Sequence, residues 1–170
     1  SGGKGCAMTV PATLTERDQM LEWLVGAVPY IRFLGIRFDR MGDEITAHLP
    51  FQPMLIGNPA IPALHGGVTA AFLEVAAIIE LSWSSLWEDL SAGRMAAGDL
   101  GPGHLPPLPK TIDFTVDYLR AGQPKDCYAS ARINRSGRRF ASVHVEAWQD
   151  SRDKPFAMAS VHFLMPEDEA

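Results

Sequence analysis

The stretch that decides the fold runs from residue 65 to residue 90 and reads HGGVTAAFLEVAAIIELSWSSLWEDL. Beyond Gly67 it contains neither proline nor glycine, so it predicts one helix from His65 to about Leu90. At roughly 3.6 residues per turn, this helix has about seven turns. Because it is apolar on nearly all sides, the rest of the chain must cover it almost all round.

The segments on either side of this helix are expected to supply that cover as strands. Alternation of apolar and polar residues, with aromatic and β-branched side chains, predicts four strands after the helix, separated by turn signals. The close spacing of those four indicates an antiparallel meander. Two more strands precede the helix and flank a hairpin turn at Met41–Glu44. The predicted strands are Phe33–Arg40, Ile45–Pro50, Thr111–Leu119, Cys127–Asn134, Ala141–Gln149 and Ala157–Met165.

The predicted elements form an α+β domain in which one curved antiparallel sheet surrounds one long helix. The chain has 170 residues, which suits a single domain. We expect that domain to cover residues 15–170, starting with a short helix that Thr15 caps and that ends near Gly26. Residues 1–14 are expected to be a disordered tail or a cloning remnant. Residues 51–64 and 91–110 are predicted to be loops.

Composition excludes some classes of partner. The net charge of −5 argues against a nucleic acid bound through a broad basic surface. Two cysteines, Cys6 and Cys127, are too few for a disulfide framework and favour a reducing compartment. The longest uncharged run, residues 55–73, is interrupted by proline and glycine and makes a poor membrane span. With no secretory leader visible, we expect a cytoplasmic protein that binds no membrane.

Glu74 is the residue of the helix that most needs an explanation. At about 100° per residue, its neighbours on the same stripe are all small or apolar. Small residues let another backbone approach, so this face is expected to pack against a partner helix. A carboxylate there is either functional or hydrogen-bonded at the rim of an interface. The stripe consists of Gly67, Ala70, Ala71, Ala77, Ile78 and Leu81.

The start of the helix offers groups that could bind a polarised carbonyl oxygen. Gly66 and Gly67 leave backbone N–H groups open at the positive end of the helix, as in an oxyanion hole, or merely permit a tight turn. His65 could act as a general base, although a structural hydrogen-bonding role is favoured. Asn58 could orient water or substrate, or cap a turn.

Distance along the helix then predicts an oligomer. Gly66 and Glu74 are eight residues apart, about 12 Å at 1.5 Å per residue, so one helix cannot bring both to one carbonyl. Two copies of the helix running antiparallel across a two-fold axis would place Gly66 of one subunit opposite Glu74 of the other. If both residues react with the same group, we expect at least a homodimer with composite sites.

Three segments together resemble a known family. They are Leu55-Ile56-Gly57-Asn58-Pro59, Leu64-His65-Gly66-Gly67-Val68 with Glu74 downstream, and Thr111-Ile112-Asp113-Phe114 with Asp117-Tyr118-Leu119-Arg120-Ala121. This combination is similar to the hotdog-fold acyl-CoA thioesterases of the phenylacetate-degradation (PaaI) type, over about residues 33–165. The resemblance implies a hotdog fold, dimers or dimers of dimers, and hydrolysis of acyl-CoA to free acid and coenzyme A.

The resemblance also implies roles for particular residues. The family's oxyanion donor corresponds to the N–H of Gly66, and its catalytic carboxylate corresponds to Glu74, as nucleophile or as base. Asn58 and Thr111 correspond to its polar loop residue and to its strand hydroxyl. The family uses no metal and no cofactor besides the coenzyme A of its substrate. The chain departs from the family in the length of residues 91–110, which bears on the shape of the acyl pocket.

An arginine cluster could bind the coenzyme A portion. Arg135, Arg138 and Arg139 surround a predicted turn at Ser136-Gly137 and form a local positive patch that suits phosphates. The alternative is a solvated turn that blunts the edge of the sheet. Arg120 is a second candidate.

Two other functions stay open. A hydratase or dehydratase of acyl thioesters would need an acid–base pair, which His65 and Glu74 could supply. A non-catalytic acyl-CoA-binding module would bind without releasing thiol. The remaining histidines lack the spacing typical of metal ligands; they are His48, His104, His144 and His162.

Overall fold

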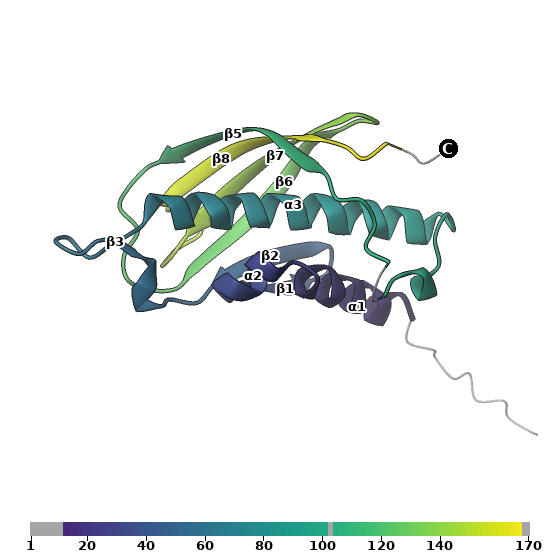
Figure 1. Ribbon diagram of the computed structural model, residues 1–170, viewed down its shortest axis with the longest axis horizontal. Helices are drawn as coiled ribbons and strands as arrows, with labels where there is room; N and C mark the ends of the chain where they lie inside the picture. Colours follow the sequence, from purple (N-terminus) through teal and green to yellow (C-terminus); the bar gives the residue numbers. More distant parts are fainter. Residues whose placement is uncertain (1–11, 102–103, 168–170) are drawn as a thin grey trace, which may run out of the picture.

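A computed structural model describes residues 12–101 and 104–167, and it places the long helix at the centre of the molecule. This helix, α3, spans Gly66–Ser91, close to the predicted limits. Six antiparallel strands form one sheet in the order β1-β2-β6-β7-β8-β5. In Figure 1, β5 and β8 pass on one side of α3 while β1 and β2 lie on the other, so the sheet curves round the helix. The predicted α+β hotdog architecture is therefore confirmed.

The strands of this sheet lie within a few residues of their predicted positions, apart from the start of the first. A separate two-stranded hairpin, β3 with β4, and two short 3₁₀ helices occur inside the segments predicted as loops. The main strands are β1 (Arg37–Met41), β2 (Glu44–Leu49), β5 (Lys110–Tyr118), β6 (Cys127–Ser136), β7 (Phe140–Trp148) and β8 (Ala157–Leu164). The short elements are η1 (Pro53–Leu55), β3 (Ile56–Asn58), β4 (Ala63–Leu64) and η2 (Ala97–Asp99).

The core lies between α3 and the inner face of the sheet. Alternate residues of β7 and β8 point inward and are at most 3% exposed, while the residues between them face solvent. Phe72 and Leu73 of α3 are completely buried against this layer. Each such side chain contributes about 1.5–3 kcal/mol relative to an exposed one. By length and composition α3 would suit a membrane span, but more than half of its most apolar 18-residue stretch is buried inside the protein.

The start of the first long strand was predicted wrongly. Residues 33 and 34 belong to a helix, α2 (Pro29–Leu34), and β1 begins only at Arg37. Proline at the first helical position and Gly35 in the left-handed conformation (φ 72°) at the end define this short helix.

The first helix, α1, spans Ala12–Gly26. Its end was predicted correctly, but Thr15 lies inside it and is not its cap. Residues 12–14, expected in the tail, form its first turn, and proline at position 11 in the sequence is compatible with a helix start there. Residues 1–11 lie outside the described part of the chain. The Arg17 guanidinium stacks on the rings of Trp83 and Trp87, which fastens α1 to the side of α3 opposite Glu74.

The predicted four-strand meander is correct for β6, β7 and β8 but wrong for β5. β5 pairs with β8 at an edge of the sheet, and β6 pairs with β2. The turn signal at residues 121–124 shows that the chain reverses, but not which strand it joins. Since β2 and β7 occupy both sides of β6, the free edge of β8 is the place left for β5.

Candidate active site

Glu74 lies on the side of α3 that β5 crosses. It is half-buried, and the Thr111 hydroxyl donates a hydrogen bond to its carboxylate, with Oγ1 and Oε1 3.1 Å apart. A bulge in β5 between Thr111 and Asp113 breaks the regular alternation of the strand. Bulges commonly redirect a side chain in this way. The structure therefore brings together two residues that are 37 positions apart in the sequence.

The small-residue stripe beside Glu74 is only partly covered within one subunit. Ala70, Ala71 and Ile78 keep part of their surface exposed, whereas Ala77 and Leu81 are buried. The open part of the stripe is adjacent to β5, which has a strand on one side only in the part of the chain that the structure describes. A helix face and a strand edge are thus open next to each other.

Gly66 presents a free N–H at the start of α3. Across residues 12–101 and 104–167, no acceptor for this N–H is found, while the carbonyl of the same residue accepts a hydrogen bond from the Tyr118 hydroxyl at 2.8 Å. The N–H lies at the positive end of the helix dipole. Tyr118 had no predicted role, although it lies in the last of the quoted family segments.

His65 acts as the cap of α3. Its Nδ1 accepts a hydrogen bond from the Gly67 N–H at 2.8 Å, which corresponds to the structural role considered for it. The Gly67 N–H is therefore occupied in this conformation. Gly57 of β3 passes so close that a Cβ there would lie 2.5 Å from the His65 Cα. The sequence reasoning gave Gly57 no role of its own, and a larger residue would displace the helix start.

Asn58 caps a turn in the hairpin that precedes α3. Its Oδ1 accepts a hydrogen bond from the Ala60 N–H at 3.1 Å, an arrangement typical of asparagine before proline. The β3–β4 hairpin projects from the body of the protein beside the first turn of α3 (Figure 1). Within one chain, Asn58 is therefore a turn-forming residue on a projecting loop.

The predicted arginine cluster exists at the β6–β7 hairpin. Arg135, Arg138 and Arg139 line a cavity of about 810 Å³ together with Ile112 and Phe140. Both apolar side chains are more than half exposed, at 53% and 56%. Positive charge and exposed apolar surface in one cavity suit a ligand that carries both phosphates and a ring.

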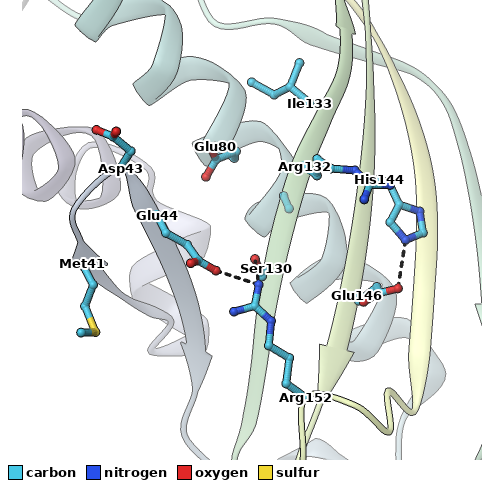
Figure 2. Close-up of a pocket in the computed structure, with 11 residues that line it drawn as sticks. Met41, Asp43, Glu44, Glu80, Ser130, Arg132, Ile133, His144, Glu146 and Arg152 are labelled. Atoms are coloured by element: carbon cyan, nitrogen blue, oxygen red, sulfur yellow. Dashed lines mark hydrogen bonds and ion pairs between the residues drawn. The ribbon is translucent and has the colours of Figure 1, made fainter.

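A different cavity, of about 650 Å³, opens where β2 and β6 separate. The two strands pair only from Ala47 to Leu49 of β2. Beyond those pairs the strands diverge, and Glu80 of α3 lines the cavity between them. Figure 2 shows the Glu80 carboxylate in this opening, with Glu44 bonded to Arg152 near its entrance. Burial raises the pKa of Glu80 from 4.5 to about 7, and the charge of Glu44 adds to the effect. Sequence reasoning assigned Glu80 no role.

Replacing Glu80 by glutamine is expected to change how stability depends on pH. The pKa of Glu80 is higher in the folded chain than in the unfolded chain. Its contribution to the free energy of unfolding is therefore complete below about pH 4.5 and is lost as pH rises towards 7. Above pH 7, Glu80→Gln should therefore raise the free energy of unfolding by about 1–3 kcal/mol, with allowance for partial exposure. Urea denaturation at pH 5 and pH 8 measures this. The exposed Glu88→Gln is the control, and equal pH slopes for wild type and Glu80→Gln would contradict the expectation.

Cys127 does not supply a nucleophile. Its side chain is buried, 1% exposed, and burial raises the pKa of the thiol to about 12. The thiolate is the reactive form of cysteine, so a thiol that stays protonated is inert. Cys127 is therefore excluded as the reactive group of the site.

Comparison with known proteins finds similarity over the region that contains Gly66, Glu74 and Thr111. Residues 57–164 match the family model described as the acyl-CoA thioesterase N-terminal domain. The medium/long-chain acyl-CoA thioesterase YigI of Escherichia coli (strain K12) is 36% identical over 129 residues, which is 74% of this chain and 78% of that protein.

Two solved structures extend the comparison to the fold. A protein from Shewanella oneidensis related to the thioesterase superfamily has a TM-score of 0.68 and 25% identity, over 92% of this chain and 99% of that one. The BH2602 protein from Bacillus halodurans, solved with CoA, has a TM-score of 0.60 and 19% identity, over 96% and 99%. The latter likeness is one of fold alone.

Proposed function

Because the chain belongs to the acyl-CoA thioesterase family, we propose that it hydrolyses medium- and long-chain acyl-CoA at sites shared by two subunits. The observation that carries this proposal is the pairing of a free Gly66 N–H with a half-buried Glu74 on the open side of one helix. The motif suggests the PaaI-type arrangement of catalytic groups. The proposed length of the substrate's acyl group, medium to long, follows from the likeness to YigI.

The Gly66 N–H is the proposed oxyanion donor. It has no partner in the described part of the chain and lies at the positive end of a 26-residue helix. A thioester carbonyl oxygen directed at it would gain a hydrogen bond that strengthens as negative charge develops. The Tyr118 hydroxyl, bonded to the Gly66 carbonyl, keeps this first turn in place.

Glu74 is the proposed reactive carboxylate. Thr111 donates to one carboxylate oxygen and leaves the other available to deprotonate a water molecule or to attack the carbonyl carbon. Both routes need the ionised form. Asn58, on the projecting hairpin, is proposed to position water or substrate. His65 is proposed to contribute only as the cap that shapes the helix start.

A homodimer would bring these groups together. About 12 Å separates Gly66 from Glu74 along one helix, too far for one carbonyl. A second copy related by a two-fold axis could pair its β5 with the open β5 edge and lay its α3 antiparallel on the open stripe. Gly66 would then face Glu74 of the partner subunit, giving two identical sites, which a dimer of dimers would double.

The arginine-lined cavity is proposed to hold the nucleotide end of coenzyme A. Arg135, Arg138 and Arg139 supply charge for the phosphates, and exposed Phe140 offers a face for adenine. Ile112, another wall residue, directly precedes Asp113 in the bulge that begins at Thr111. The pantetheine arm would therefore pass the edge at β5 to reach Glu74. We propose a cytoplasmic location, consistent with the free, buried thiol of the described cysteine.

A panel of acyl-CoA substrates tests the function. Purified protein with butyryl-, octanoyl-, dodecanoyl- and palmitoyl-CoA is expected to release free coenzyme A, measured with a thiol-reactive dye, fastest with the longer chains. Formation of enoyl-CoA from a hydroxyacyl-CoA without thiol release would instead indicate the hydratase. Saturable binding with no product from any substrate would indicate the non-catalytic module.

A further inference from the structure

A cavity of about 750 Å³ lies beyond Glu74 towards the end of α3, and neither the sequence motif nor the family comparison assigns it a role. The last turns of α3 form one wall, the residues leading into β5 form another, and the segment after β8 closes it. The cavity is called the distal pocket, and it is also lined by Arg138, which borders the arginine-lined cavity as well. Its uncharged lining residues are Ser82, Ser85, Leu86, Met95, Pro106, Pro107, Leu108, Pro109, Met165 and Pro166.

The distal pocket lies on the same side of α3 as Glu74. At 100° per residue, Ser85 is only about 20° round the helix from Glu74, and half-buried Ile78 lies between them. Ser82 is eight residues beyond Glu74, about 12 Å along the helix. On the facing wall, Leu108 is three residues before Thr111, about 10 Å along an extended chain. Both walls thus lead from the Glu74–Thr111 contact to the pocket over similar distances.

The interior of the distal pocket is mostly apolar, and it contains one hydroxyl without a hydrogen-bond partner among the described residues. Leu86 is buried, and Leu108 and Met165 pack against the core while still lining the cavity. Ser82 is only 5% exposed, yet its hydroxyl has no hydrogen-bond partner among the described residues. A helical serine usually bonds to a carbonyl one turn earlier. An alkyl chain cannot supply that bond, so the case for an apolar occupant rests on Leu86, Leu108 and Met165.

Charged groups end the apolar region at its far rim. Asp89 pairs with Arg94 at 2.8 Å, and Arg138 and exposed Glu167 also line the cavity. From Glu74 to Asp89 is about 22 Å along the helix. An extended alkyl chain advances roughly 1.3 Å per methylene, given single C–C bonds of about 1.5 Å. A chain that starts at the reacting carbonyl would therefore reach the charged rim after roughly 14–17 carbons.

We propose that the distal pocket binds the acyl tail of the substrate and that its depth limits the length of the chain that is hydrolysed. This inference rests on the proposed function, because it takes the thioester carbonyl to lie beside Glu74. The occupant is a saturated alkyl chain, which matches the apolar walls. The part of the 91–110 segment that precedes β5 is then a specificity element.

Two bulky substitutions at different depths test this proposal. Ser82→Phe should abolish the gain in kcat/KM beyond octanoyl-CoA, and Ser85→Phe should abolish it only beyond dodecanoyl-CoA. Each should lower kcat/KM for palmitoyl-CoA at least about 10-fold, since a pocket discriminates by roughly 10–200-fold per misplaced methylene. Butyryl-CoA, which is too short to reach the pocket, should be hydrolysed within about twofold of wild type. Ser91→Phe, at the exposed end of α3, is the matched control and should keep the wild-type profile.

The outcomes separate this proposal from the function on which it rests. Should buried Ser82→Phe fail to fold, as judged by circular dichroism, Ser85→Phe against Ser91→Phe carries the test. An unchanged chain-length profile in an active Ser85→Phe variant would overturn the distal-pocket proposal alone, as would equal loss of butyryl-CoA and palmitoyl-CoA hydrolysis. Failure of the wild-type protein to release thiol from any acyl-CoA would instead overturn the proposed function.

Discussion

Replacing Glu74 by glutamine is expected to lower kcat/KM for acyl-CoA hydrolysis by about 100- to 10,000-fold, the range over which a positioned acid or base contributes. Glutamine has nearly the same size and can still accept the hydrogen bond from Thr111. It can neither take a proton from water nor attack a carbonyl carbon. The loss should appear in kcat, because the carboxylate acts on the reacting atoms rather than on substrate binding.

Glu80→Gln is the matched control for this experiment. It makes the same chemical change on the same helix, but in the opening between β2 and β6 (Figure 2). We expect it to retain wild-type turnover, while both variants keep the wild-type circular dichroism spectrum. Turnover by Glu74→Gln within twofold of wild type would remove Glu74 from the mechanism.

The second large effect is a recovery of activity when two inactive variants are combined. Gly66→Pro removes the proposed oxyanion donor, and the helix tolerates proline at its first position. His65 before it is already extended, with ψ at 129°, as a residue preceding proline must be. Alone, this variant should lose about 100-fold or more in kcat, the usual result of removing one oxyanion donor.

Co-expression of Gly66→Pro with Glu74→Gln should restore about a quarter of wild-type activity. Random pairing makes half of the dimers mixed, and in each mixed dimer one site combines an intact Gly66 with an intact Glu74. Differently tagged chains allow the mixed dimers to be purified and assayed directly. The control pairs Glu74→Gln with Glu74→Ala, which leaves no intact site. Mixed dimers that form but remain inactive would exclude a site shared between subunits.

The features that could be predicted from the sequence are those with a local signature. An uninterrupted apolar stretch defined α3, and alternation defined β6, β7 and β8, because helix and strand periods are properties of short segments. Glu74 stood out by the same reasoning, since a helical period places it on a stripe of small residues. The antiparallel-helix dimer stays a prediction.

The features that could not be predicted depend on contacts between distant segments. The Glu74–Thr111 hydrogen bond requires β5 at the edge of the sheet and a bulge that interrupts its alternation, and no local pattern encodes either. Tyr118 reaches Gly66 for the same reason. The opening at Glu80 exists because β2 and β6 separate after a few pairs, which is a property of the curved sheet as a whole.

Strand β5 contacts α3 at two places with different roles. Thr111, near its start, holds Glu74, and Tyr118, at its end, holds the carbonyl of Gly66. In the proposed dimer, these two places belong to different active sites, because Glu74 and Gly66 of one subunit contribute to two separate sites. A single strand therefore joins the two reaction centres. A substitution that displaces β5 is then expected to affect both centres.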